Sequence, residues 1–324
     1  MVLRAARTLC QTGRTMIDEA AGSVARAVPR QRAQRRAMSS NASSVLMLAP
    51  ALLLCGIFIF VPAALAIVGS FYSFGLTSQN WVWEGAGNYV RAANDPIFWV
   101  ALRNNLIIVI GSVILQVGIG CILAAILDRG LPRGKIFFRT IIFMPMVVSA
   151  VAVALIWLII LDPNVGILNA IVKSLGLAPP QRGWLGDPNI SIYVVLVVAA
   201  WQYTGFMMVL ILAGLQSIPK ELYEAASLDG ARGLKAFWFI TLPAIRNVLL
   251  VAVLITTIGG FKVFDFVYVL TQGGPANATQ VLGTYIFLQG FNLTNMGYAN
   301  AISVVLLVIA VILGWFQLKA SRRA

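Results

Sequence analysis

The chain has 324 residues, of which 60% are hydrophobic and only 11% are charged. In a soluble globular protein about a quarter of the residues are charged, so this composition excludes an ordinary soluble domain and indicates a membrane protein. The net charge is +13, but the basic residues lie between apolar runs and not in one soluble stripe, which argues against a nucleic-acid partner.

The N-terminal 44 residues are rich in arginine and precede an apolar run. This basic region is too long for a cleavable signal peptide, and the apolar run that follows is also too long. Asp18 and Glu19 argue against a mitochondrial transit peptide. We expect residues 1–44 to form a disordered cytoplasmic tail, or the natural chain to start at Met38.

Six stretches of the remaining chain are long and apolar enough to cross a bilayer, which takes about 20 residues per helix. They are residues 45–70, 101–127, 141–161, 190–215, 247–270 and 301–318. Lipid cannot satisfy backbone polar groups, and continuous apolar runs favour helices over barrel strands. The sequence therefore predicts an all-α membrane protein, with one transmembrane domain over residues 45–324.

The distribution of basic residues predicts the orientation of these spans. Arginine and lysine gather before the first span, after the second, after the fourth and after the sixth. The three opposite loops contain only Arg91, Lys173 and Arg182 between them. Positive charge marks the cytoplasmic side of a membrane protein, so both termini are predicted to be cytoplasmic.

The loop at residues 216–246, between spans four and five, contains a short predicted helix. Ser217 is a candidate N-cap, Pro219 suits the first turn, and Gly230 is a candidate helix end. One face of this helix would present Leu222, Ala225, Ala226 and Asp229. Periodicity alone would also fit a surface helix that lies on the membrane.

The amino-acid sequence of this loop resembles the "EAA" loop of binding-protein-dependent ABC importers. The resemblance rests on Glu224-Ala225-Ala226, Asp229-Gly230-Ala231 and Ile240-x-Leu242-Pro243. In that family the loop forms a coupling helix that docks into a cleft of the cytoplasmic ATPase. By this resemblance Glu224 would contribute charge to the contact, Ala225 and Ala226 would permit close packing, and Gly230 would allow the turn.

Other segments resemble the maltose-type carbohydrate uptake permeases, over most of the chain from about residue 45. The resembling segments are Phe143-x-Pro145 with Ser149 and Trp157, and residues 261–275, which end in Thr-Gln-Gly-Gly-Pro. The second segment resembles the first of the two unlike permeases, in its shorter six-span form. The uncharged loop at residues 271–300 is expected to form a polar outer surface, in contact with a binding protein or with water.

The resemblance implies a set of partners in the bacterial inner membrane. These are a second permease, two ATPase subunits that hold ATP and Mg, and an extracytoplasmic solute-binding protein. This chain has no G-x-x-x-x-G-K-[ST] loop, so it is expected to bind no cofactor and to hydrolyse no ATP by itself. Transport would follow alternating access.

Two groups of residues are candidates for solute contact. Lys262 and Asp265 lie three residues apart in the fifth span and would share a helix face, either as an internal ion pair or as solute contacts. Trp201, Gln202, Tyr203 and Thr204 combine aromatic faces with amide and hydroxyl groups, which suits a sugar, although tryptophan and tyrosine also line membrane interfaces. Gln116 in span two is expected to hydrogen-bond between helices.

We therefore predict the permease subunit of an ATP-driven importer for a sugar or oligosaccharide. A polyol, glycerol phosphate or another anionic sugar remains an alternative solute, and an ion-coupled secondary transporter is a rival mechanism. An intramembrane enzyme is disfavoured: the chain contains no histidine, which excludes a Ser-His-Asp triad and His-based metal sites. No metal site is predicted.

Overall fold

The structure is a computed structural model that describes residues 40–77, 80–129 and 134–322. The chain divides into two compact units, Met1–Val61 and Pro62–Ala324. The prediction of a disordered tail, and the alternative start at Met38, fall outside the described residues.

The first unit contains helix α2 (Ser40–Cys55) and the π-helical turn η1 (Gly56–Phe60), and α3 (Val61–Gly69) follows. The next elements are the paired strands β1 (Tyr72–Ser73) and β2 (Val82–Trp83) and helices α4 (Gly87–Asn94), α5 (Pro96–Ser112), η2 (Val113–Gly118) and α6 (Ile119–Arg129). The middle of the chain forms α7 (Lys135–Val147), α8 (Ala150–Ile160), α9 (Ile167–Ser174) and α10 (Ser191–Gln216). The remainder forms α11 (Lys220–Leu228), α12 (Leu234–Ala236), η3 (Phe237–Thr241), α13 (Leu242–Ala244), α14 (Arg246–Phe261), α15 (Asp265–Leu270), α16 (Leu282–Phe287), η4 (Leu288–Asn292) and α17 (Met296–Arg322).

Among the described residues, four continuous helical segments are long and apolar enough to cross a membrane. They are Met47–Gly69, Pro96–Asp128, Ser191–Gln216 and Met296–Lys319. Two further pairs of helices qualify only if each bent pair counts as one span, and they meet at 99° (α7 with α8) and 71° (α12–α13 with α14). The structure is mostly helical, apart from the short pair β1 and β2, and it has four to six candidate membrane spans.

Helix α10 packs at the centre of the second unit. Its buried residues belong to two apolar clusters, one shared with α8 and α15 and the other with α6 and α14. Small residues allow the helices to approach closely. A side chain added at Gly205 would overlap the backbone oxygen of Ile142 in α7 and lie 2.8 Å from the Phe143 Cα.

The expectation of one continuous helix over residues 247–270 is wrong. Helix α14 ends at Phe261, and α15 begins only at Asp265. The Asn105 amide of α5 donates to the Gly260 carbonyl in the last turn of α14 (3.3 Å), and its oxygen accepts the N–H of Leu282 at the start of α16 (2.7 Å). Backbone groups at helix ends lack partners within the helix, and Asn105 supplies a partner at each of these two ends.

The segment at residues 271–300, predicted to be a polar outer surface, is partly buried. It contains α16 and η4, and Thr279, Gln280 and Gln289 are buried. The Asn104 amide donates to the carbonyl oxygens of Ala278 and Gln280, both at 2.8 Å. The segment is therefore fixed against α5.

A polar cluster fixes the start of α5 against α16 and α17. The Asp95 carboxylate caps α5 by accepting the Ile97 N–H (2.9 Å), and it also accepts the hydroxyl groups of Tyr298 (2.7 Å) and Tyr285. The Arg91 guanidinium lies 4.2 Å from the centre of the Tyr298 ring. Burial, and then the hydrogen bond to Asp95, raises the pKa of Tyr285 to about 12, so its hydroxyl remains a donor.

This cluster predicts a pH dependence of stability. Burial raises the pKa of Asp95, but hydrogen bonds from Tyr285, Tyr298 and the backbone outweigh it and leave the pKa below its usual value. Ionised Asp95 therefore stabilises the fold at pH values above the pKa of an aspartate in the unfolded chain, about 3.9. This stabilisation is lost as the pH falls from there through the lowered pKa of Asp95 in the folded protein. We expect the difference in melting temperature between the wild type and Asp95→Asn to shrink as the pH is lowered through this range. A difference that stays constant would contradict the assignment.

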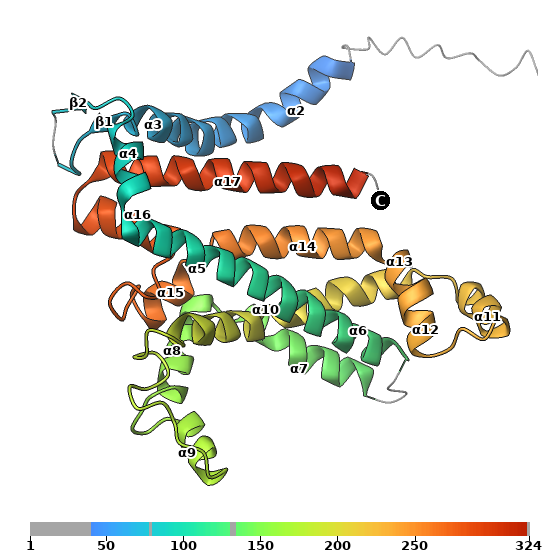
Figure 1. Cartoon of the computed structure of the whole chain (residues 1–324). Helices are drawn as coiled ribbons and strands as arrows, with labels where there is room; N and C mark the ends of the chain where they lie inside the picture. Colours follow the sequence, from blue (N-terminus) through green and yellow to red (C-terminus); the bar gives the residue numbers. More distant parts are fainter. Residues whose placement is uncertain (1–39, 78–79, 130–133, 323–324) are drawn as a thin grey trace, which may run out of the picture. The chain divides into compact units, whose positions relative to one another are not determined.

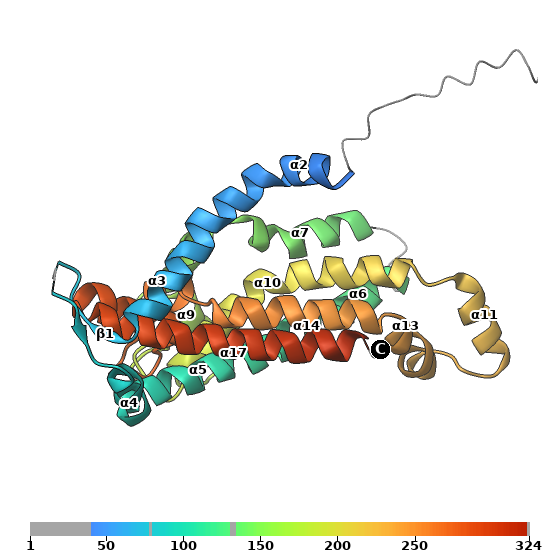
Figure 2. The ribbon, with the colours of Figure 1, turned by 90° about the horizontal axis from the view of Figure 1, so that it is seen from above.

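The two ends of the second unit differ in their elements (Figures 1 and 2). Helices α11, α12 and α13 lie at one end, together with the C-terminal end of α17. Strand β1 and helix α4 lie at the other end. The long helices α5, α10, α14 and α17 connect the two ends.

Candidate coupling surface and central cavity

Helix α11 contains most of the residues predicted for coupling. It begins at Lys220 after Pro219, so the predicted N-cap at Ser217 is wrong, and the Ser217 hydroxyl instead donates to the Gly214 carbonyl at the end of α10 (2.7 Å). Glu224 and Ala225 are exposed, and Ala226 is partly buried. The helix therefore presents its glutamate and one alanine outward.

The predicted end of this helix at Gly230 is confirmed. Asp229 is the C-cap, and Gly230 follows with φ +77°, a left-handed conformation that glycine adopts without strain. The N–H of Gly230 donates to the Ser227 carbonyl (3.3 Å), and that of Ala231 donates to the Ala226 carbonyl (2.9 Å). Gly233 also has a positive φ, +58°, so two glycines bracket the turn between α11 and α12.

Leu242 and Pro243 lie in α13, separated from α11 by α12 and η3. Helix α11 is connected to this region by a hydrogen bond between the hydroxyl groups of Tyr223 and Thr241 (3.0 Å). Thr241 is buried and also donates to the Ala236 carbonyl (3.3 Å). The predicted coupling residues therefore occupy two connected helices at one end of the unit (Figure 2).

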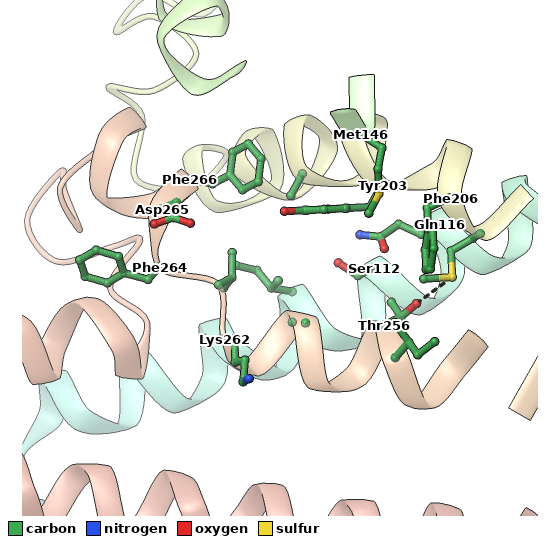
Figure 3. Close-up of a pocket in the computed structure, with 17 residues that line it drawn as sticks. Ser112, Gln116, Met146, Tyr203, Phe206, Thr256, Lys262, Phe264, Asp265 and Phe266 are labelled. Atoms are coloured by element: carbon green, nitrogen blue, oxygen red, sulfur yellow. Dashed lines mark hydrogen bonds between the residues drawn. The ribbon is translucent and has the colours of Figure 1, made fainter. Parts of the chain in front are cut away.

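A cavity of about 270 Å³ lies between α5, η2, α7, α10 and the break between α14 and α15 (Figure 3). Its polar lining consists of Ser112, Gln116, Tyr203, Thr256, Lys262 and Asp265. Its aromatic lining consists of Tyr203, Phe206, Phe264 and Phe266. Aromatic faces next to hydroxyl, amide and charged groups can contact the apolar faces and the hydroxyl groups of a sugar.

Three of the six candidate solute-contact residues line this cavity: Tyr203, Lys262 and Asp265. Lys262 and Asp265 do not share a helix face, because the chain leaves the helix between them. Their side chains point to different sides, and they form no ion pair in the part of the chain that the structure describes (Figure 3). The alternative of an internal ion pair is therefore wrong.

The other three, Gln202, Thr204 and Trp201, do not line this cavity. Gln202 is buried, and its amide donates to the Val148 carbonyl (2.8 Å) at the break between α7 and α8. The Thr204 hydroxyl donates to the Ala200 carbonyl of its own helix (2.6 Å). Thr204 and Trp201 instead line a second, largely apolar groove between α6, α7 and α10. Trp201 also packs edge-on against Trp157, with the ring centres 5.6 Å apart.

The contact with Val148 gives a testable role for Gln202. We expect Gln202→Leu to leave the Val148 carbonyl unpaired, which costs about 1–3 kcal/mol. The melting temperature of the purified complex should fall, while the apparent affinity for the solute stays unchanged. A variant with normal stability and weakened solute affinity would contradict this role.

Ser112 and Gln116 are cavity residues that the sequence analysis did not assign to the solute. Both are buried, and neither side chain forms a hydrogen bond with another described residue. Their spacing of four residues within an apolar run was the available signal, since it places two polar groups on one helix face. Figure 3 shows Ser112, Gln116 and Tyr203 directed toward the same space. Among residues 40–77, 80–129 and 134–322, no three His, Cys, Asp or Glu side chains group to hold a metal ion.

Comparisons with known proteins agree with this architecture. Residues 116–324 match the family described as "Binding-protein-dependent transport system inner membrane component". The chain is 39% identical to a probable ABC transporter permease protein, YurN, of Bacillus subtilis, over 85% of this chain and 94% of the relative. It is 34% identical to the lactose transport system permease protein LacF of Rhizobium radiobacter, over 86% of this chain and 93% of the relative. A bacterial ABC transporter that imports the acidic polysaccharide alginate superposes with a TM-score of 0.75 at 25% identity, over 87% of this chain and 96% of that chain.

Proposed function

The chain belongs to the family of inner-membrane components of binding-protein-dependent transport systems, and from this premise we propose that it is one of two permeases that form the pathway of an ATP-driven sugar importer. The observation that carries the proposal is a cavity with aromatic and polar walls between α5, η2, α7, α10 and the break between α14 and α15. The permease itself performs no chemistry. The driving ATP, with its Mg, belongs to two separate ATPase subunits.

The end that carries α11 is proposed to be cytoplasmic. The part of the chain at this end includes the basic residues Lys135, Arg139, Lys220, Arg232, Lys235, Arg246 and Lys319. The opposite end carries Arg91, Lys173 and Arg182, with Arg103 near the start of α5. This excess of positive charge supports a cytoplasmic location. Six spans, with both termini cytoplasmic, would follow if each bent helix pair crosses the membrane.

Helix α11 is proposed to be the element that contacts an ATPase subunit. Glu224, Ala225 and Ala226 would form the contact, and the turn at Asp229 and Gly230 would transmit movement to α12, α13 and the Leu242–Pro243 pair. Exposed apolar side chains of the same region, Leu222, Leu228 and Leu234, support a surface that a protein partner covers. ATP-driven closure of the two ATPases would then tilt the spans between inward-open and outward-open states.

The cavity is proposed to bind the solute during transport. Tyr203, Gln116 and Ser112 would contact a sugar ring and its hydroxyl groups, and Lys262 and Asp265 would lie at the margin. The lactose relative supports a neutral sugar, whereas the alginate importer and the unpaired Lys262 support an anionic one. The second permease would complete the site, and an extracytoplasmic binding protein would deliver the solute.

An experiment can distinguish a solute-contact role of Gln116 from a role as an interhelical hydrogen bond. We expect Gln116→Leu to weaken the apparent solute affinity about fivefold, equivalent to the loss of one hydrogen bond of about 1 kcal/mol. Stability should be unaffected, because the amide has no partner among the described residues. Gln202→Leu is the matched control, since it should lower stability and leave affinity unchanged. Equal behaviour of the two variants would contradict the assignment.

The transport mechanism is tested by uptake into proteoliposomes that contain the whole complex. We expect uptake of labelled sugar to require ATP on the ATPase side and binding protein on the other side. Imposed proton or sodium gradients should have no effect. Uptake driven by an ion gradient without ATP would favour the rival secondary transporter.

A further inference from the structure

A surface helix usually turns its apolar face toward the core, but helix α9 leaves two isoleucines exposed and buries an asparagine. Its polar residue Asn169 is buried, donates to the Pro163 carbonyl (2.7 Å) and accepts from the Trp184 indole N–H (2.7 Å). Ile167 is 65% exposed and Ile171 is 50% exposed. Helix α9 therefore turns Asn169 toward the protein, beside Leu168, which packs against the apolar core, and it turns Ile167 and Ile171 outward.

The outward apolar side is continuous beyond the helix. Ile167, Ile171 and Leu175 recur every four residues, so they lie on one face. Gly176, with φ +73°, ends the helix, and the Leu177 N–H donates to the Val172 carbonyl (3.1 Å), which folds Leu177 back toward the last turn. Leu175 and Leu177 are both more than half exposed.

Helix α8, which precedes α9 in the chain, also presents apolar side chains outward. Ile156 and Ile159 of α8 are exposed, whereas Val153 and Ala154 are buried against the core. Helix α8 belongs to a bent pair that is apolar enough to lie in a membrane. The exposed apolar side chains of α9 therefore follow, a few residues later in the chain, an exposed apolar face of a candidate membrane span.

The charged residues of this segment leave positive charge beside the apolar face. The Asp162 carboxylate accepts the Asn164 and Val165 N–H groups, and Asp187 accepts the Asn189 N–H, so both acids cap turns. Lys173 and Arg182 are exposed and form no ion pair within the described parts of the chain. Unpaired cations at the edge of an apolar helix face fit the phosphate groups of lipids.

We propose that α9 lies in the headgroup region of the outer leaflet, with the side chains of Ile167, Ile171 and Leu175 at the acyl boundary. Lys173 and Arg182 contact lipid phosphates. The helix thereby anchors the outer end of α8 to the membrane. The partner is a phospholipid surface, and this inference depends on the membrane location of the chain, not on the identity of the solute.

The proposal is tested with a single fluorescent label at position 171. Ile171→Cys is made in a chain whose native cysteines are replaced, labelled with an environment-sensitive dye, and studied as the whole complex in nanodiscs of phosphatidylethanolamine and phosphatidylglycerol. Gln181→Cys, at an exposed polar position of the same loop, is the matched control. We expect the label at position 171 to emit at shorter wavelength, to lose most of its fluorescence to spin-labelled lipid, and to be protected from iodide.

Three results would overturn the proposal. The first is iodide quenching at position 171 equal to that at position 181, which would mean that the face is solvated. The second is protection from both quenchers together with crosslinking to the binding protein or the second permease, which would assign the face to a protein partner. The third is equal retention of phosphatidylglycerol by the wild type and by the Lys173→Gln/Arg182→Gln variant, which we expect to retain less.

Discussion

Replacement of Gly230 by proline is expected to abolish solute-stimulated ATP hydrolysis and transport while leaving membrane insertion intact. Gly230 has φ +77°, which the proline ring cannot adopt, and its N–H donates to the Ser227 carbonyl, a bond that proline removes. The local cost is about 3 kcal/mol, enough to displace the end of α11. Gly230→Ala should impair coupling less, because the left-handed conformation costs an alanine about 1–2 kcal/mol.

Gly176→Pro is a matched control for this experiment. Gly176 also ends a short helix, with φ +73°, and its N–H also donates to a carbonyl three residues earlier, that of Lys173 (3.0 Å). Neither glycine has another atom within 4 Å of an added Cβ. Gly176→Pro should preserve ATPase coupling. If Gly230→Pro couples normally, or if both variants fail equally, the assignment of α11 is wrong.

Replacement of Gly205 by alanine is expected to have the largest effect on folding. The added Cβ would overlap the Ile142 backbone oxygen, and neither backbone can move without separating α10 from α7. A clash of this kind costs about 3 kcal/mol and also disturbs the cavity beside Tyr203. We expect a large loss of folded protein, measured as monodisperse complex in detergent and as a lowered melting temperature.

Gly314→Ala is the control for Gly205→Ala. Gly314 lies within α17, and an added Cβ there meets nothing within 4 Å. Alanine in a helix interior is favoured over glycine by about 0.5–1 kcal/mol, so this variant should be neutral or slightly more stable. A Gly205→Ala complex as stable as Gly314→Ala would contradict the close crossing of α7 and α10.

The interruptions of the spans could not be predicted from apolar runs. A hydropathy criterion considers only how many apolar residues follow one another, and residues 141–161 and 247–270 are both long and apolar enough to be predicted as spans. Whether a helix breaks depends on partners elsewhere in the chain that receive the freed backbone groups. Gln202 binds the Val148 carbonyl at one break, and Asn105 binds the Gly260 carbonyl at the other. The first contact joins residues that are 54 positions apart in the sequence, and the second joins residues that are 155 positions apart.

The end of α11 was more predictable because it is a local property. Glycine after a run with helical periodicity indicates a C-terminal left-handed residue, and Gly230 has that conformation. The cavity was less predictable, since Gln202 and Tyr203 are adjacent but point in different directions, one toward Val148 and the other into the cavity. Without the neighbouring helices, the sequence could not determine which of them faces the solute. Their functional roles stay predictions.

The central claim is that this chain couples solute delivery to ATP hydrolysis by partner subunits. The most direct measurement is ATPase activity of the complex in lipid, with and without the binding protein and candidate sugars. We predict stimulation that requires both the binding protein and its sugar and that disappears in Gly230→Pro. The account would be contradicted by a chain that recruits no ATPase. It would also be contradicted by a complex whose ATPase activity does not change when the binding protein and the sugar are added.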